Sequence, residues 1–209
     1  MDASDEATIG ATTALDAGLA FLTDNASAPL SRDNVSACRD GIIAGHIELE
    51  HRFGAGTDAR ELVALRSDFI DAIVKQLWQR SGLAESPHAL FPVGGYGRRE
   101  LHPYSDVDIA IVLGRTPTKA EQKTIAAFVT FLWDIGLEVG HSVRSVKECA
   151  KAAADDLTII TNLMEARSLC GPPERLLELS RATATNKIWS PSEFFAAKQA
   201  EQVDRYLKY

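Results

Sequence analysis

The chain has 209 residues, of which 45% are apolar and 24% are charged, proportions typical of globular proteins rather than of disordered, fibrous or disulfide-rich chains. Its 22 lysines and arginines face 29 aspartates and glutamates, and the resulting charge of −7 argues against general nucleic-acid binding. The three cysteines lie far apart, and no apolar run approaches the ~20 residues of a membrane span. We therefore expect a reduced, cytoplasmic protein with neither a nucleic-acid nor a membrane partner.

The N-terminal third of the chain predicts helices. Residues 1–30 are rich in alanine, threonine, aspartate and serine, and we expect a loose N-terminal arm there. Apolar residues then recur every three or four positions in two stretches, one from Ser31 to about Gly54 and one over roughly 58–80. Both stretches predict amphipathic helices that pack against a core.

Short apolar runs replace the helical pattern after residue 88. Residues 89–93 (ALFPV) and 107–113 (VDIAIVL) predict strands, and Pro92 favours an edge or terminal position for the first of them. Residues 137–143 (LEVGHSV) predict a third strand. We expect an α/β fold in which a small mixed sheet of three or more strands is flanked by the two N-terminal helices.

The last third of the chain again predicts helices. Capping boxes at Thr118 and Ser145 begin two of them, and three more are expected over about 156–170, over about 174–183 and from Ser190 onward. We therefore expect a helical region over 145–209. Its final helix has no stop signal, so we also expect the chain to be truncated at its C-terminus.

Two aspartates form the clearest candidate for chemistry. Asp106 and Asp108 are two positions apart at the start of a predicted strand, so their carboxylates are expected on one face. Carboxylates this close repel each other, and a divalent cation such as Mg²⁺ removes that penalty while also binding substrate phosphates. The pair is therefore a candidate half of a two-metal site, although such a pair alone is more often a solvated edge or a turn.

Glycines follow the first predicted strand directly, where the lack of side chains lets backbone N–H groups approach phosphate oxygens. The spacer between these glycines and Asp106 leaves room for one turn of helix and a return into the next strand. We therefore expect phosphate donors beside the two carboxylates, with nearby polar side chains adding to them. The candidate nucleotide-binding residues are Gly94, Gly95, Gly97, Arg98 and Ser105.

The string GGYGRRELHPYSDVDIAIVL resembles the signature of the polymerase-β-like nucleotidyltransferase superfamily. With FLWDIGLEVGHSVRSVKEC and DLTIITNLMEARSLCG after it, the chain from about Leu62 onward is similar to the N-terminal part of the bacterial PII uridylyltransferase/uridylyl-removing enzymes. The resemblance implies a nucleotidyltransferase domain over 31–144 that includes the N-terminal packing helices. It also implies transfer of UMP from UTP to a tyrosine of the PII nitrogen-signalling protein, with release of pyrophosphate.

The resemblance also assigns roles to individual residues. It implies that Gly94 and Gly95 hold the triphosphate and that Asp106 and Asp108 bind Mg²⁺, with two ions expected. Most members of the superfamily carry a third metal-binding carboxylate on the neighbouring strand. Glu138 is the candidate for that position here, and an exposed strand charge is the alternative interpretation.

Two other functions stay open at this point. Because the enzymes of this family are several times longer, the chain is alternatively a nucleotide-binding module without turnover in isolation. It is alternatively a nucleotidyltransferase that uses ATP or another acceptor, since no residue is seen to read the base. Mg²⁺-dependent UTP binding without pyrophosphate release would favour the first alternative, and competition between UTP and ATP tests the second.

Overall fold

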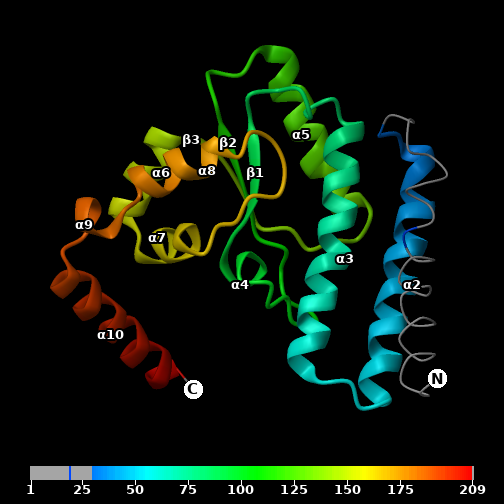
Figure 1. Cartoon of the computed structure of the whole chain (residues 1–209), viewed down its shortest axis with the longest axis horizontal. Coiled ribbons are helices and arrows are strands. Elements are labelled where there is room, and N and C mark those ends of the chain that lie inside the picture. The colour runs from blue at the N-terminus through cyan, green and yellow to red at the C-terminus, as the bar shows by residue number, and fades with distance from the viewer. Residues whose placement is uncertain (1–18, 20–29, 209) are drawn as a thin grey trace, which may run out of the picture.

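A computed structural model describes Leu19 and residues 30–208, so the predicted arm over 1–30 lies almost wholly outside the described residues. The predicted fold class is confirmed: the described part is an α/β structure with a small mixed sheet and helices on both faces of that sheet (Figure 1). No helix in this described part is both long and apolar enough to cross a membrane.

The sheet has the order β1-β2-β3, with β1 antiparallel to β2 and β2 parallel to β3. The predicted edge position of the strand that contains Pro92 is confirmed. On the open side of that strand, Leu90 forms an antiparallel bridge with Cys170. The strands are β1 (Ala89–Pro92), β2 (Ile109–Leu113) and β3 (His141–Ser145).

The third strand begins later than its residue pattern predicts. Regular pairing starts at His141, although the ladder is continued before it by hydrogen bonds from Val107 N to Glu138 O (2.7 Å) and from Ile109 N to Gly140 O (2.9 Å). Val107 lies just before β2 and Ile109 begins it, and both donate to carbonyl groups of 138–140. The segment is therefore extended and attached to the sheet without being a full strand.

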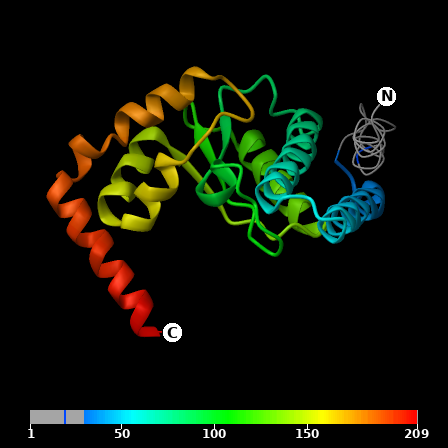
Figure 2. The same ribbon diagram turned by 60° about the horizontal axis from the view of Figure 1, so that its bottom comes forward.

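Alternate residues of β2 serve two separate cores. Ile109 and Ile111 belong to one core, which lies against the helices before β1 and the helix between β2 and β3. Ala110 and Val112 belong to the other core, which lies against the helices after β3. Figures 1 and 2 both show these two groups of helices on opposite sides of the sheet. The first group is α2 (Val35–Gly54), α3 (Ala59–Arg80) and α5 (Lys119–Asp134), and the second is α6 (Val146–Asp155), α7 (Leu157–Met164) and α8 (Glu174–Ala182).

The helix predicted after Asp156 ends early because the segment that follows it returns to the sheet. The helix expected over about 156–170 stops at Met164, since Arg167 N then donates to Pro92 O (3.2 Å) and Cys170 N to Leu90 O (3.1 Å). Both predicted capping boxes, at Thr118 and Ser145, are present. The remaining elements are η1 (Arg32–Asn34), α4 (Gly94–Gly97), α9 (Thr185–Ile188) and α10 (Pro191–Lys208).

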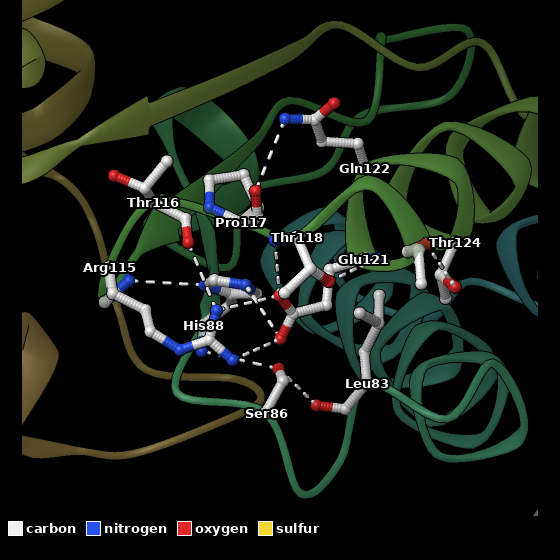
Figure 3. A network of polar contacts seen from close by, with 12 residues as sticks. Leu83, Ser86, His88, Arg115, Thr116, Pro117, Thr118, Glu121, Gln122 and Thr124 are labelled. Carbon is white, nitrogen blue, oxygen red and sulfur yellow. Dashed lines mark hydrogen bonds and ion pairs between the residues drawn. The ribbon is translucent and has the colours of Figure 1, made fainter.

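A polar cluster around His88 attaches the start of β1 to α5 (Figure 3). His88 is fully buried, and its Nδ1 accepts a hydrogen bond from Gly114 N at 3.3 Å, which leaves Nε2 to carry the proton. That Nε2 lies 3.6 Å from Glu121 Oε1. Glu121 is itself held by two hydrogen bonds from Arg115 and one from Thr118 N. The histidine is therefore packed as a neutral group beside a charged pair.

We expect this cluster to make folding sensitive to mild acid. Burial lowers the pKa of His88 below its usual 6.5, so the unfolded chain binds the proton more readily and stability should fall as the pH drops below about 6.5. His88→Asn keeps an acceptor for Gly114 N–H and removes this titration. Urea denaturation at about pH 5 and about pH 8 should therefore show a smaller pH effect in the variant than in the parent. Glu121, with its pKa lowered to about 2, titrates outside this window.

Candidate functional site

Asp106 and Asp108 lie on the extended segment that leads into β2. Since side chains alternate along a strand, both fall on the face of Ala110 and Val112 rather than on the opposite one. Asp108 is half-buried, and burial, followed by the charge of Asp106, raises the pKa of its carboxyl above the usual 3.8. The two carboxylates are therefore close enough for their charges to interact, on one side of the sheet.

Two glycines border the Asp108 carboxylate. A Cβ atom added to Gly140 would lie 2.1 Å from Asp108 Oδ1, and one added to Gly94 would lie 3.6 Å from Asp108 Oδ2. Gly94 also has a φ of 58°, in the left-handed region that favours glycine. The glycine turn after β1 and the Asp108 carboxylate before β2 thus meet in space, as their spacing along the chain predicts.

Gly140→Ala should therefore displace the carboxylate without disturbing the sheet. The backbone of Gly140 lies outside the left-handed region, so alanine is tolerated there, but its methyl would occupy the position of Asp108 Oδ1. We expect Mn²⁺, a spectroscopic substitute for Mg²⁺, to bind at least ~10-fold more weakly, as when a metal ligand loses its orientation. Electron paramagnetic resonance titration measures this. Gly54→Ala, with nothing within 4 Å of the added atom, is the matched control.

The glycine turn forms α4, the single helical turn that the spacer allows. The first N–H groups of a helix have no partner within it, so those of Gly94 and Gly95 lie at its open end. Gly97 serves packing instead, because a Cβ atom there would lie 2.2 Å from the backbone oxygen of Glu165 at the end of α7. The three predicted glycines thus share one turn, with Gly94 beside Asp108, Gly95 beside Glu100 O and Arg98, and Gly97 against the end of α7.

A buried polar network, which the sequence did not reveal, fixes this turn. Asp71 of α3 accepts two hydrogen bonds from Arg167 and one from the Tyr96 hydroxyl, each at 2.7 Å. The Arg167 guanidinium also lies over the Tyr96 ring, 5.2 Å from its centre. Burial, and next the Asp71 charge, raise the pKa of Tyr96 well above 10. The centre of α4 is therefore tied both to α3 and to the segment after α7.

The two predicted side-chain donors are placed differently. Arg98 Nη2 lies 3.8 Å from where a Cβ atom of Gly95 would be, and the guanidinium forms ion pairs with Glu100 (2.7 Å) and Glu165 (2.5 Å). These carboxylates, Glu100 first, raise the pKa of Arg98. Ser105 lies in an exposed turn, where its N–H donates to His102 O at 3.1 Å. Arg98 thus adjoins the glycine turn. Among the described residues, Ser105 shows no contact with the glycines of that turn.

Glu138 lies on the neighbouring extended segment, as predicted. It is exposed, and the parallel register places it opposite Asp106, on the same face. Among the described residues, however, no group of three or more histidines, cysteines, aspartates or glutamates is arranged to hold a metal ion. The metal-binding role of Glu138 therefore stays a prediction.

The chemistry of the aspartate pair fits a divalent cation. The raised pKa of Asp108 records an unfavourable charge that a bound cation would relieve, and both ligands are the hard oxygens that Mg²⁺ prefers. The side chain of Asn162 in α7 also lies beside Gly94, near Asp108. Its Oδ1 is 3.3 Å from the position that a Cβ atom of Gly94 would take. A single helical asparagine gives no signal in the sequence, and only the DLTIITNLMEARSLCG string drew attention to this segment.

Comparison with known proteins gives a family and a set of relatives. The family model described as "Putative nucleotidyltransferase DUF294" matches residues 22–143. The chain is 48% identical to the bifunctional uridylyltransferase/uridylyl-removing enzyme of Pseudomonas aeruginosa (strain LESB58) over 162 residues. These residues are 77% of this chain and 18% of that protein. It is 45% identical over 181 residues to the enzyme of the same name from Pseudomonas syringae pv. tomato, covering 86% and 20% respectively. The chain thus spans about a fifth of the length of these curated relatives.

Proposed function

Because this chain belongs to the nucleotidyltransferase family DUF294, we propose that it is the nucleotidyltransferase portion of a PII uridylyltransferase. In this role it transfers UMP from UTP to a tyrosine of the PII nitrogen-signalling protein in the cytoplasm and releases pyrophosphate. One observation carries the proposal: the Asp108 carboxylate adjoins the glycine turn, in a chain about 45% identical to uridylyltransferases over most of its length. Residues 31–144 supply the catalytic domain in this proposal, and residues 145–209 a helical region.

Asp106 and Asp108 would hold Mg²⁺, as two ions, with Glu138 as the third carboxylate. Bound there, Mg²⁺ offsets the charge that develops on the transferred phosphoryl group and lowers the pKa of the attacking hydroxyl. The protein contributes position: both aspartates come from one short segment, and the hydrogen bonds of Val107 and Ile109 attach that segment to the chain before β3. This attachment supports the proposal because metal ligands must keep a fixed geometry.

The triphosphate would be held by the open end of α4. Backbone N–H groups of Gly94 and Gly95 face an anion at close range in this assignment, because no side chain intervenes, whereas the Gly97 N–H donates to Val93 O at 3.0 Å and this glycine supports the turn. Arg98 and Ser105 add donors from the same loop. The ion pairs of Arg98 with Glu100 and Glu165 show that its guanidinium already serves carboxylates, and phosphate oxygens are ligands of the same kind.

Labelling of PII tests the proposal. The chain is incubated with PII, Mg²⁺ and UTP that carries ³²P at the α-phosphorus, and we expect the label on PII and pyrophosphate in solution. Excess unlabelled UTP should suppress the labelling, whereas excess ATP should not. Asp106→Asn should fold and fail to label, and equal labelling by this variant would contradict the assignment.

The same experiment separates the two alternatives. A chain that binds UTP in the presence of Mg²⁺ but releases no pyrophosphate is a nucleotide-binding module without turnover in isolation. A chain that transfers label from ATP, or to an acceptor other than PII, is a nucleotidyltransferase of different specificity.

A further inference from the structure

A cavity lies between α2, α3 and the turn that leads to Asp106. It has a volume of about 490 Å³, within the range of small-molecule sites, and neither Asp106 nor Asp108 lines it. Its walls come from α2, α3, the turn before Asp106 and the segment before Gly140. They are mostly apolar and include Phe53, Val63, Leu101, Val107 and Leu137.

Arg66 is a cation in this cavity without an ion pair to any described residue. Arg66 of α3 lines the cavity, and its Nη1 donates to the backbone oxygen of His102 at 2.8 Å. Among the described residues, Arg66 forms no salt bridge, and its Nε is buried without a hydrogen-bond partner. Burial lowers the pKa of this guanidinium, which records the cost of leaving its charge uncompensated. An anion beside Arg66 would reduce that cost.

The other polar side chains of the lining, which restrict the anion that fits, are His46, Glu50, Tyr104, Ser105 and Glu138. Glu50 and Glu138 also line the cavity, so a dianion such as a phosphate monoester would meet two carboxylates for one arginine. His46 lines it too, and burial, followed by the charge of Arg66, lowers the pKa of this histidine, which therefore adds no positive charge at neutral pH. A single negative charge beside Arg66 meets less repulsion from these carboxylates than a dianion would, and an apolar body contacts the apolar walls.

We propose that this cavity binds a small organic carboxylate with an apolar body, whose charged group pairs with Arg66. Asp106, Asp108 and the glycine turn do not line this cavity, which therefore adjoins the proposed nucleotide site and shares Ser105 and Glu138 with it. Its ligand is recognised by one guanidinium and by the apolar walls, the combination that small-molecule sites commonly use.

Calorimetric titration with naphthalene-2-carboxylate tests the site, with no nucleotide or metal present so that the result is independent of the proposed function. We expect saturable binding of one equivalent. The uncharged naphthalene-2-carboxamide should bind at least ~10-fold more weakly, since it lacks the charge-assisted hydrogen bonds.

Variants of α3 identify the cation. Arg66→Met keeps the aliphatic stem and should weaken carboxylate binding at least ~10-fold, whereas Arg66→Lys, which keeps the charge, should lose less. Arg60→Met, at an exposed position of the same helix, should bind like the parent. Circular dichroism verifies that each variant is folded. The proposal is overturned if naphthalene-2-carboxylate does not bind, if the carboxamide binds equally well, or if folded Arg66→Met binds like the parent.

Discussion

Asp108→Asn should abolish nucleotidyl transfer and leave the fold intact. The substitution removes a metal-binding carboxylate and keeps the size of the side chain. If cation binding contributes several kcal/mol of transition-state stabilisation, the rate should fall by roughly 10³-fold. Steady-state pyrophosphate release measures this, with Asp68→Asn at an exposed position of α3 as a charge-matched control that should retain the parental rate.

The stability of the Asp108→Asn variant provides an independent measurement. Burial, and then Asp106, raise the pKa of Asp108, so ionisation of this carboxyl opposes folding. At neutral pH the variant should therefore be at least as stable as the parent. The difference should vanish below about pH 3.8, where the carboxyl is protonated in both the folded and the unfolded chain. A variant that is inactive because it is unfolded would contradict the assigned role.

Asp71→Ala should be strongly destabilising. Asp71 is only 7% exposed and accepts hydrogen bonds from Arg167 and Tyr96, so its removal leaves a partly buried guanidinium without its carboxylate. Breaking a buried pair in this way costs about 3 kcal/mol or more. Urea denaturation measures the loss. The matched control is Asp68→Ala on the same helix, whose pair with Arg99 is half-exposed and should contribute less than ~1 kcal/mol.

A double substitution separates lost attraction from buried charge. Asp71→Leu combined with Arg167→Met removes both charges while keeping apolar volume, and it should restore much of the stability that either single change removes. The Tyr96 hydroxyl loses its acceptor in this variant, so the position of α4 should still be disturbed. We therefore expect weaker nucleotide binding even where stability recovers. Equal stability of all these variants would show that the network contributes little.

Much of the fold follows from local patterns. The alternation of 107–113 predicts β2, and the residue types at Thr118 and Glu121 predict the start of α5, because strand pairing and capping depend on residues close in sequence. The aspartate pair and the glycine turn were found for the same reason: each candidate lies within one short segment. The early end of α7 was not predicted, since it depends on hydrogen bonds from Arg167 and Cys170 to a strand far away in the chain.

The sequence by itself thus predicted the three strands and most of the helices in their order, and it singled out the aspartate pair and Gly94 as candidates, because spacing along one segment controls which side chains share a face. Only the tertiary structure decided what surrounds them. The approach of Gly140 to Asp108, the pairing of Asp71 with Arg167 and the cavity beside Arg66 all join segments separated by tens of residues. Such contacts depend on how the helices pack on the sheet, and no periodicity within a single segment encodes that arrangement.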